Sequence, residues 1–429
     1  MTSTDTSTPG APTTPGRLRS LAGGPTTTAA ATRRQSAAMA GVWLLTRVVM
    51  LVLLALDGIG VRGVSREVHD LYQSWYRQLA EGWFPVGDVT WQYPPGAAGV
   101  MLSADLLPFL TFFQSFVALT VLCDALVTLA LLRAARRPDG SRDGAWAWVI
   151  GLPLLLSIPF ARYDVQTTAF AVLALLAVRY RPRLAGVAAG LGAMVKVWPA
   201  LTLLGTPRGR TTRQAWTSAV AAGAGVLLFF TVFFDGAWDF LDNQEERGIQ
   251  IESVGGTALQ LAKHLGDWSG YATFQYGAME FVGPGVPTIA TLSLVATVLA
   301  FAWLLLWRVL ARRWTTATPF DAALTAVLLF TVTSRVISPQ YMIWLLGLAA
   351  VCLTCRHTTQ RPIALLLLAA TLVSVLAFPI SYNRVIASDL WGTTLMVVRN
   401  GLLLTAAGWS AARLWRSAIG PEPTPRPLT

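Results

Sequence analysis

The chain has 429 residues, of which 54% are hydrophobic and only 13% are charged, whereas soluble domains carry roughly 25% charged residues. Its net charge of +11 comes almost entirely from arginine, since Lys196 and Lys263 are the only lysines. The arginines form short clusters between apolar runs, which is typical of loops retained in the cytoplasm. The charge therefore indicates membrane topology and argues against nucleic-acid binding, for which no soluble domain is long enough.

Apolar runs of about 18 or more residues predict membrane-spanning helices, because open sheet edges cannot exist in lipid. Residues 1–36, rich in Thr, Ser, Pro and Gly, predict a disordered tail whose arginines keep it in the cytoplasm. The first span, residues 39–57, then runs outward into a long outer loop, residues 58–109. The return span at residues 110–134 is followed by a hairpin of two spans, at residues 144–160 and 163–180.

Residues 184–206 are apolar, yet arginine clusters flank both ends. A single crossing would leave one cluster outside, whereas two short half-helices that enter and return would keep both in the cytoplasm. Pro199 interrupts the run directly after Lys196, and proline breaks helices, so the re-entrant hairpin is the favoured reading.

The remaining spans complete the predicted topology. Residues 214–234 lead outward to a second outer loop, residues 235–286, and five more spans follow: residues 287–309, 319–336, 339–355, 361–379 and 389–412. The sequence thus predicts an all-α polytopic protein with ten crossings and one re-entrant hairpin within residues 37–412. We expect it in the plasma (inner) membrane, with both its N-terminal tail and residues 413–429 in the cytoplasm.

A charge within a membrane is costly, so each one requires an explanation. Six such charges are predicted at outer helix ends or in outer loops: Asp57, Asp70, Arg162, Asp164, Arg335 and Arg384. Asp124 and Lys196 are expected nearer the membrane interior or inner face, as structural polar ties. The scattered histidines and the three cysteines show no metal-ligand spacing.

The first outer loop combines acids with aromatic residues, namely Asp70, Tyr72, Asp88, Trp91 and Tyr93. A carboxylate that handles hydroxyls beside aromatic faces suits a carbohydrate, although an interfacial belt of Trp and Tyr would have the same composition. In the later part of the chain, an arginine at an outer turn, position 335, could grip a phosphate through two parallel hydrogen bonds or merely contact lipid headgroups.

Four stretches together resemble a known family: residues 70–72 leading to 88–95, residues 162–164, residues 190–199, and the pair 247–253 and 334–341. They are similar to the C-type glycosyltransferases that use polyprenyl-phosphate sugars, specifically glycosyltransferase family 87 with its actinobacterial α-mannosyltransferases. The resemblance implies the C-type fold. It also implies inverting transfer of a sugar, mannose first, from a polyprenyl-phosphate donor to a glycolipid or glycan acceptor outside the cytoplasm, without a cofactor or essential metal.

The resemblance also implies roles for individual residues. Asp70 would be the general base that takes the proton of the acceptor hydroxyl, with Asp57 as second choice. Arg335 would stabilise the charge that develops on the leaving phosphate, with Arg162 and Arg384 behind it. The expected substrate contacts are Tyr72, Asp88, Trp91, Tyr93, Arg247, Gln250, Glu252, Gln340 and Tyr341.

Other functions remain open at this point. A polyprenyl-phosphate arabinose donor is the alternative within the same class. A lipid or solute transporter, or a non-catalytic membrane scaffold, is the alternative from another class, although transporters usually place their charges at the membrane midplane and show internal repeats. The sequence leaves the donor sugar, the linkage, the acceptor and the oligomeric state undetermined.

Overall fold

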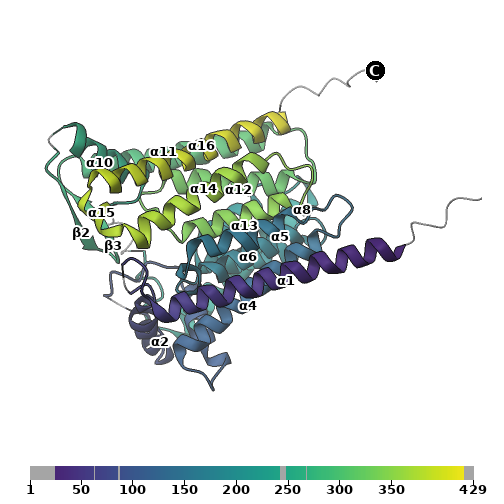
Figure 1. The fold of residues 1–429 in the computed structure, drawn as a ribbon, viewed down its shortest axis with the longest axis horizontal. Coiled ribbons are helices and arrows are strands. Elements are labelled where there is room, and N and C mark those ends of the chain that lie inside the picture. Colours follow the sequence, from purple (N-terminus) through teal and green to yellow (C-terminus); the bar gives the residue numbers. More distant parts are fainter. Residues whose placement is uncertain (1–24, 62, 86, 242–247, 267, 420–429) are drawn as a thin grey trace, which may run out of the picture.

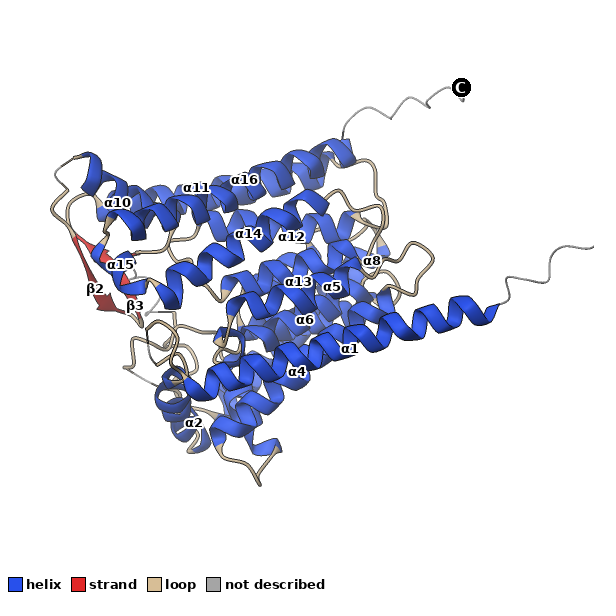
Figure 2. Cartoon of the chain, in the orientation of Figure 1, coloured by secondary structure: helices blue, strands red, loops and turns tan. Residues whose placement is uncertain are grey.

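The computed structural model describes residues 25–419, apart from residues 62, 86, 242–247 and 267, as an elongated bundle of helices (Figure 1). One end of the bundle carries the two long predicted outer loops and the only strands in the described chain, and we name it the loop end (Figure 2). The opposite end gathers the short arginine-rich connections together with the first and last described residues, and we name it the arginine-rich end.

Every predicted crossing is occupied by helix, which confirms the all-α polytopic architecture. Five of the described helices are long and apolar enough to cross a membrane: Arg34–Leu56, Phe112–Ala134, Arg210–Phe233, Val286–Leu310 and Arg361–Ile380. The helices at the predicted crossings are α1 (Pro25–Leu56), α4 (Phe112–Ala134), α5 (Asp143–Gly151) with η3 (Leu152–Leu155), α6 (Asp164–Ala177), α8 (Arg210–Phe233), α11 (Val286–Leu310), α12 (Thr318–Thr333), α13 (Tyr341–Leu353), α14 (Arg361–Val375) with η6 (Leu376–Ile380), and α16 (Leu390–Ile419).

Both predicted tails are shorter than expected, because the terminal helices extend into them. α1 already begins at Pro25, a residue whose fixed φ suits the first helical turn, and an alanine-rich stretch follows. α16 continues to Ile419 because Leu414 and Ala418 are buried in a cluster with Trp307 of α11. Residues 1–24 and 420–429 of the predicted disordered tails lie outside the described residues.

Residues 184–206 enter the bundle and return to the arginine-rich end, as the re-entrant hairpin requires. α7 (Pro182–Val195) packs beside α6, and its end brings Lys196 Nζ to 2.6 Å from Oδ1 of Asp164, at the start of α6. The backbone is extended at Lys196, and the 3₁₀ helix η5 (Trp198–Leu203) leads back. Tyr180 before the hairpin and Pro207 after it line one cavity at the arginine-rich end.

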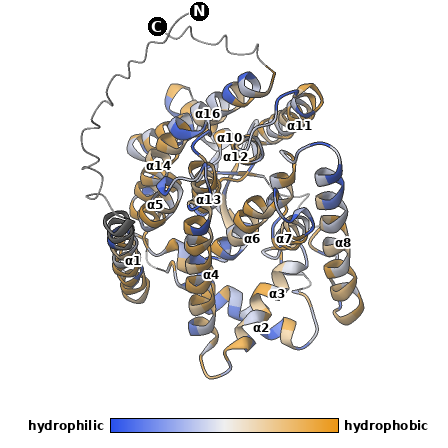
Figure 3. Ribbon diagram, turned by 90° about the vertical axis from the view of Figure 1, so that its right-hand side faces the viewer, coloured by the Kyte–Doolittle hydropathy of each residue, from blue (hydrophilic) through white to orange (hydrophobic). Residues whose placement is uncertain are grey.

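Small residues let the hairpin pack closely against α8. A Cβ added at Gly186 would lie 2.0 Å from the carbonyl oxygen of Ala215, and one at Gly190 would lie 2.3 Å from that of Ala219. Such spacing of small residues is typical of helix contacts inside membranes, where backbones approach directly. The apolar outer sides of α8 and α11 are left for lipid, since only 6% of the most hydropathic window of each is buried (Figure 3).

Asp124 in the middle of α4 is the structural tie that the sequence predicted. Its carboxylate accepts hydrogen bonds from Arg47 Nε and Nη2, both at 2.8 Å, and from the indole nitrogens of Trp43 and Trp148, both at 2.7 Å. The carboxylate therefore has four donors and is fully committed to joining α1, α4 and α5.

Both long loops at the loop end contain regular secondary structure. The first long loop contains η1 (Glu67–Tyr72), α2 (Gln73–Ala80), α3 (Gly96–Leu102) and η2 (Ser103–Leu106). The second contains α10 (Val254–Leu265) and an antiparallel sheet of order β1–β3–β2, formed by β1 (Ile249–Gln250), β2 (Tyr271–Gln275) and β3 (Ala278–Val282). The short helix α15 (Tyr382–Ala387) completes this end.

Candidate functional site

A polar cavity of about 320 Å³ opens at the loop end. Its walls come from segments far apart in the chain: η1 and α2, the stretch before α3, the turn of the re-entrant hairpin, the tip of the β2–β3 hairpin, and the connection between α12 and α13. The volume is within the range of ordinary ligand sites, and the fold alone brings these segments together.

The deepest charges of this region form the ion pair between Lys196 and Asp164. The lysine lines the cavity and is only 9% exposed, while the aspartate is fully buried. Three aromatic rings surround the ammonium, with Nζ 4.4 Å from the ring centroid of Tyr163, 5.4 Å from Trp344 and 5.5 Å from Tyr93. This cage stabilises the buried cation by cation–π attraction. Lys196 is thus a polar tie, as predicted, but it lies at the loop end rather than toward the membrane interior or inner face.

The second oxygen of Asp164 is left without a partner. The first oxygen accepts from Lys196 and, at 2.5 Å, from the indole nitrogen of Trp344. Oδ2 is buried and makes no hydrogen bond to any described residue, and the same holds for Oε1 of Gln166 two residues later. Buried polar atoms are normally satisfied, so these two acceptors, at the start of α6, point to water or a ligand in the functional state.

A second ion pair closes one wall of the cavity. Glu67 lines the cavity from η1, and its Oε2 lies 3.0 Å from Nη2 of Arg162. Arg162 is itself buried and donates from Nη1 to the carbonyl oxygens of Ala161, at 2.7 Å, and Val64, at 3.3 Å. The guanidinium therefore ties the first loop to the start of α6.

Arg335 lines the cavity from the connection between α12 and α13, and Gln250 of β1 fixes this connection. The backbone nitrogen of Gln250 donates to the carbonyl oxygen of Arg335 at 3.1 Å, and the side-chain Oε1 of Gln250 accepts from the backbone nitrogen of Ile337 at 2.8 Å. Arg335 also interacts with other residues of the protein. Gln250 itself is buried, so it positions the arginine's loop and does not face the cavity.

The tip of the β2–β3 hairpin roofs the cavity. Tyr276 and Gly277 both have positive φ, 49° and 75°, which is the conformation of a tight two-residue hairpin turn. The tip rests on the first loop, because Nε2 of Gln92 lies 3.4 Å from the carbonyl oxygen of Tyr276. Tyr271 and Phe274, on opposite faces of the edge strand β2, are both exposed beyond the cavity.

Four of the predicted site residues line this cavity: Arg335, Tyr93, Gln340 and Tyr341. A fifth, Arg162, reaches it through Glu67. Arg247 lies outside the described residues.

The structure does not bring the predicted base, Asp70, to the cavity wall. Asp70 is exposed on η1, next to His69, whose ring stacks on Phe113 at a centroid distance of 4.0 Å. Glu67 and Leu71 of η1, a π-helix, and Trp75 of α2 line the cavity, whereas Asp70 is not among the residues of its wall. Asp57, the second choice, instead holds its own loop by accepting from the backbone nitrogens of Gly63 and Val64.

Three aromatic-loop residues that were expected to contact substrate are packing residues. Tyr72 and Trp91 are buried among other rings, and burial raises the pKa of Tyr72 well above its usual value, so its hydroxyl stays protonated. Asp88 orients the loop by accepting from Trp75 Nε1 at 2.9 Å and from the backbone nitrogen of Thr90 at 2.9 Å.

Two further predicted residues lie away from the cavity. Glu252 is buried and pairs with Arg399 of α16, Oε1 to Nη1 3.0 Å, which joins the second loop to the last helix. Burial raises the pKa of Glu252, while Arg399 opposes the shift. Arg384 is exposed on α15, where its nearest acid is Asp389 at 3.9 Å.

The cavity lining also includes four residues that were not predicted as site residues from the sequence: Glu67, Trp198, Tyr276 and Trp344. The i, i+4, i+8 spacing of Glu67, Leu71 and Trp75 was a usable signal for the first of these, since it marks a shared helical face. Nothing in the local sequence indicated that the hairpin tip at Tyr276 would reach the first loop.

An apolar cleft of about 400 Å³ begins beside the polar cavity. α3, α4, α6, α7 and α8 line it, chiefly with aliphatic and phenylalanine side chains such as Leu119, Leu191 and Phe230. The two spaces are adjacent along the chain, because Lys196 lines the polar cavity and Val195 the apolar cleft. A ligand with a charged head and a long hydrocarbon tail could occupy both.

Within the described residues, no group of three or more His, Cys, Asp or Glu side chains is arranged to hold a metal ion. Comparison with known proteins gave one match: the model of glycosyltransferase family 87 matches residues 91–339. No curated protein and no solved structure showed a significant match. The matched residues, more than half of the chain, include Tyr93, Lys196 and Arg335 of the polar cavity and all the residues that line the apolar cleft.

Proposed function

Because the chain belongs to glycosyltransferase family 87, a family of membrane glycosyltransferases, we propose that it moves a sugar, with mannose as first choice, from a polyprenyl-phosphate donor to a hydroxyl of a glycolipid or glycan. The transfer takes place at the loop end, on the extracytoplasmic side of the plasma membrane, and inverts the anomeric centre. The observation that carries the proposal is the pair of spaces, a polar cavity with cations and an apolar cleft, whose walls meet along the chain at Val195 and Lys196.

The lipid donor fits this pair of spaces by its chemistry. Its prenyl chain needs an apolar groove, and the cleft between α3, α4, α6, α7 and α8 supplies one among helices that belong to the membrane domain. Its phosphate needs cations, and Arg335 at the cavity wall offers a planar fork of donors that matches phosphate oxygens. As the bond to the sugar breaks, the phosphate gains charge, which a prearranged guanidinium stabilises.

Asp70 remains our candidate for the general base, and the bonding of the neighbouring carboxylates supports this. Glu67 is paired with Arg162, Asp88 accepts three hydrogen bonds, and Asp164 is paired with Lys196. The carboxylate of Asp70, in the same short helix as Glu67, makes no hydrogen bond to any described residue and is accessible. A base needs such an uncommitted lone pair, and catalytic contacts often form only in the substrate complex.

We do not assign binding of the donor phosphate to Arg162 or Arg384. Arg162 acts through Glu67, by keeping the first loop on α6, and does not bind the phosphate itself. Arg384 is 62% exposed at its side chain and lies outside the cavity lining, so it is not assigned to the donor phosphate.

The test is sugar transfer in membranes that contain the wild type, Asp70→Asn or the matched variant Glu67→Gln. Radiolabelled polyprenyl-phosphate mannose and a lipid-glycan acceptor are the substrates, and a polyprenyl-phosphate arabinose arm tests the alternative donor. We expect Asp70→Asn to lower the rate by roughly 10²–10⁴-fold, the range for loss of a general base, and Glu67→Gln to lower it by much less.

The opposite ranking would assign the base to Glu67, the carboxylate that lines the cavity. Unchanged transfer in both variants would remove the carboxylates of η1 from the chemistry. If the wild type used neither donor, the polyprenyl-phosphate sugar itself would be the wrong substrate class.

The proposed sidedness has its own test. Single cysteines at Thr211, at the arginine-rich end, and at Gln275, beside the hairpin tip, are introduced after Cys123, Cys352 and Cys355 have been replaced by alanine. In intact cells, a membrane-impermeant thiol reagent should label the cysteine at 275 and not the one at 211. The reverse pattern would place both termini outside and move the transfer site to the cytoplasm.

A further inference from the structure

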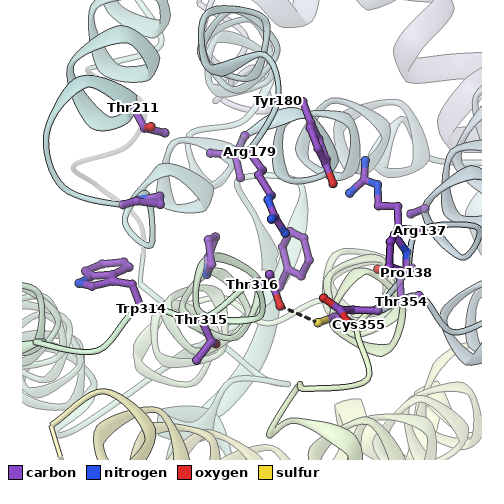
Figure 4. A pocket seen from close by; sticks show the side chains of 17 residues that line it. Arg137, Pro138, Arg179, Tyr180, Thr211, Trp314, Thr315, Thr316, Thr354 and Cys355 are labelled. Carbon is purple, nitrogen blue, oxygen red and sulfur yellow. Dashed lines mark hydrogen bonds between the residues drawn. The ribbon is translucent and has the colours of Figure 1, made fainter.

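A second, larger cavity of about 620 Å³ lies at the arginine-rich end (Figure 4). It forms where the C-terminal ends of α4, α6 and α13 meet the N-terminal ends of α8 and α12. None of its lining residues belongs to the polar cavity or to the apolar cleft. The proposed sugar transfer therefore gives it no role.

Two guanidinium groups stand at this cavity on either side of one aromatic ring. The central guanidinium carbon lies 4.7 Å from the ring centroid of Tyr180 in Arg137 and 5.7 Å from it in Arg179, and Figure 4 shows the tyrosine between the two. Arg137 is anchored through Nη2, which donates to the carbonyl oxygen of Leu176 at 2.9 Å. Its other nitrogens, and the whole guanidinium of Arg179, make no hydrogen bond to the described residues.

The negative charge around the cavity is too small to balance these cations. Asp139 is the one acidic residue among the described lining residues, and its side chain is 51% exposed and lies 3.6 Å from the ring of His357. Two like charges beside one ring repel each other, so an anion in the cavity within reach of both would be stabilised by both.

Hydroxyl groups, rather than helix dipoles, add to the two guanidinium groups at this wall. α8 and α12 begin at the cavity, but α4, α6 and α13 end there, so the partial positive charges of the N-termini are offset by the partial negative charges of the C-termini. The hydroxyls of Thr315 and Thr316 also lie in the wall, and that of Thr316 is 3.5 Å from Sγ of Cys355. The wall therefore offers cationic forks and hydroxyl donors together, a combination that suits phosphate.

We propose that this cavity binds a phosphate-bearing anion, held by charge-assisted hydrogen bonds from Arg137 and Arg179. The anion is the headgroup of an acidic phospholipid or a soluble phosphate compound, which share this chemistry. Basic pockets between membrane helices are known to take acidic lipid headgroups. The site is independent of the sugar transfer at the loop end, and either inference can fail without the other.

The experiment is native mass spectrometry of the purified full-length protein in detergent. Short-chain phosphatidylglycerol and inorganic pyrophosphate are the two phosphate probes, and phosphatidylcholine is the probe with no net charge. The variants are Arg179→Gln and the double variant Arg137→Gln/Arg179→Gln. Arg136→Gln is the matched control, since Arg136 is an exposed neighbour on the same helix that does not line the cavity.

We expect Arg179→Gln to weaken phosphate binding by about tenfold to a hundredfold, the value of one hydrogen bond to a charged group. The double variant should abolish selective binding and Arg136→Gln should leave it unchanged. Selective retention of phosphatidylglycerol assigns the site to a lipid headgroup, and selective retention of pyrophosphate assigns it to a soluble compound.

Two results would overturn the proposal: binding of neither phosphate probe above phosphatidylcholine, or equal binding by the wild type and Arg179→Gln. If the double variant does not fold, as judged by size-exclusion chromatography, Arg179→Gln alone decides. Arg179→Lys is then the second variant, and it should retain part of the binding because it keeps the charge while losing the planar fork.

Discussion

The ion pair between Asp164 and Lys196 should dominate the stability of the loop end, and Asp164→Asn tests this. The substitution keeps the shape of the side chain but removes the charge that faces the lysine ammonium at 2.6 Å. At an effective dielectric constant of 20, the direct attraction at this distance is roughly 6 kcal/mol, part of which offsets the desolvation of the two groups. The side chains are 0% and 10% exposed, so little water can replace the lost partner.

Breaking one side of a buried ion pair typically costs about 3–5 kcal/mol, because the other charge stays behind. The three rings around Lys196 lower that cost without removing it, so we place the loss for Asp164→Asn near 3 kcal/mol. For a bundle of this size, that corresponds to a fall in the melting temperature on the order of 3–4 °C.

The measurement is thermal unfolding of purified protein in detergent, with Asp143→Asn as the matched control. Asp143 pairs with Arg361 at 2.8 Å, but these side chains are 52% and 46% exposed, and exposed pairs contribute about 0–1 kcal/mol. Lys196→Met should also destabilise the protein, and the double variant Lys196→Met/Asp164→Asn should lose less than the sum of the two. Equal melting temperatures for Asp164→Asn and Asp143→Asn would refute the argument from burial.

Three further outcomes follow from the contacts described above. Gly190→Leu should abolish folding or sharply lower the yield, because even a Cβ would meet a carbonyl oxygen of α8 at 2.3 Å, whereas Gly225→Leu, with nothing within 4 Å, should express normally in the same membranes. Arg335→Gln should raise the KM for the lipid donor by about tenfold or more, while Arg384→Gln should change this KM less than twofold. Equal effects of the two substitutions would argue against a phosphate-binding role for Arg335. Gln250→Ala should lower kcat/KM without weakening the fold as a whole, because it releases the loop that carries Arg335. An unchanged kcat/KM together with a lower melting temperature would make Gln250 purely structural.

The membrane-spanning architecture could be predicted from the sequence because it depends on local composition. Runs of apolar residues locate the helices, and the arginine clusters beside residues 184–206, together with Pro199, favoured a hairpin over a single crossing, in agreement with the return of these residues to the arginine-rich end. The helix ends were predicted less well, because they are decided by contacts such as those of Leu414 and Ala418 with α11.

The candidate site was predicted less well because its geometry depends on partners far apart in the chain. Lys196 meets Asp164 across 32 positions, and Glu252 meets Arg399 across 147. A stretch of sequence shows that a charge must be compensated in a membrane, but not which charge compensates it or which cavity it faces. Glu252 was therefore predicted to contact a sugar, whereas in the structure it pairs with Arg399 of α16.

The re-entrant hairpin also sets an order of assembly during biosynthesis. The extended backbone at Lys196 and the 3₁₀ helix after it cannot face lipid, because lipid offers no hydrogen-bond partners for backbone that lies outside an α-helix. The earlier helices α6 and α7 cover part of this segment, and α12, which the ribosome makes later, covers much of the rest. A chain that ends before Thr318 should therefore insert its first spans but leave the 3₁₀ helix η5 partly uncovered and more sensitive to protease than in the complete bundle.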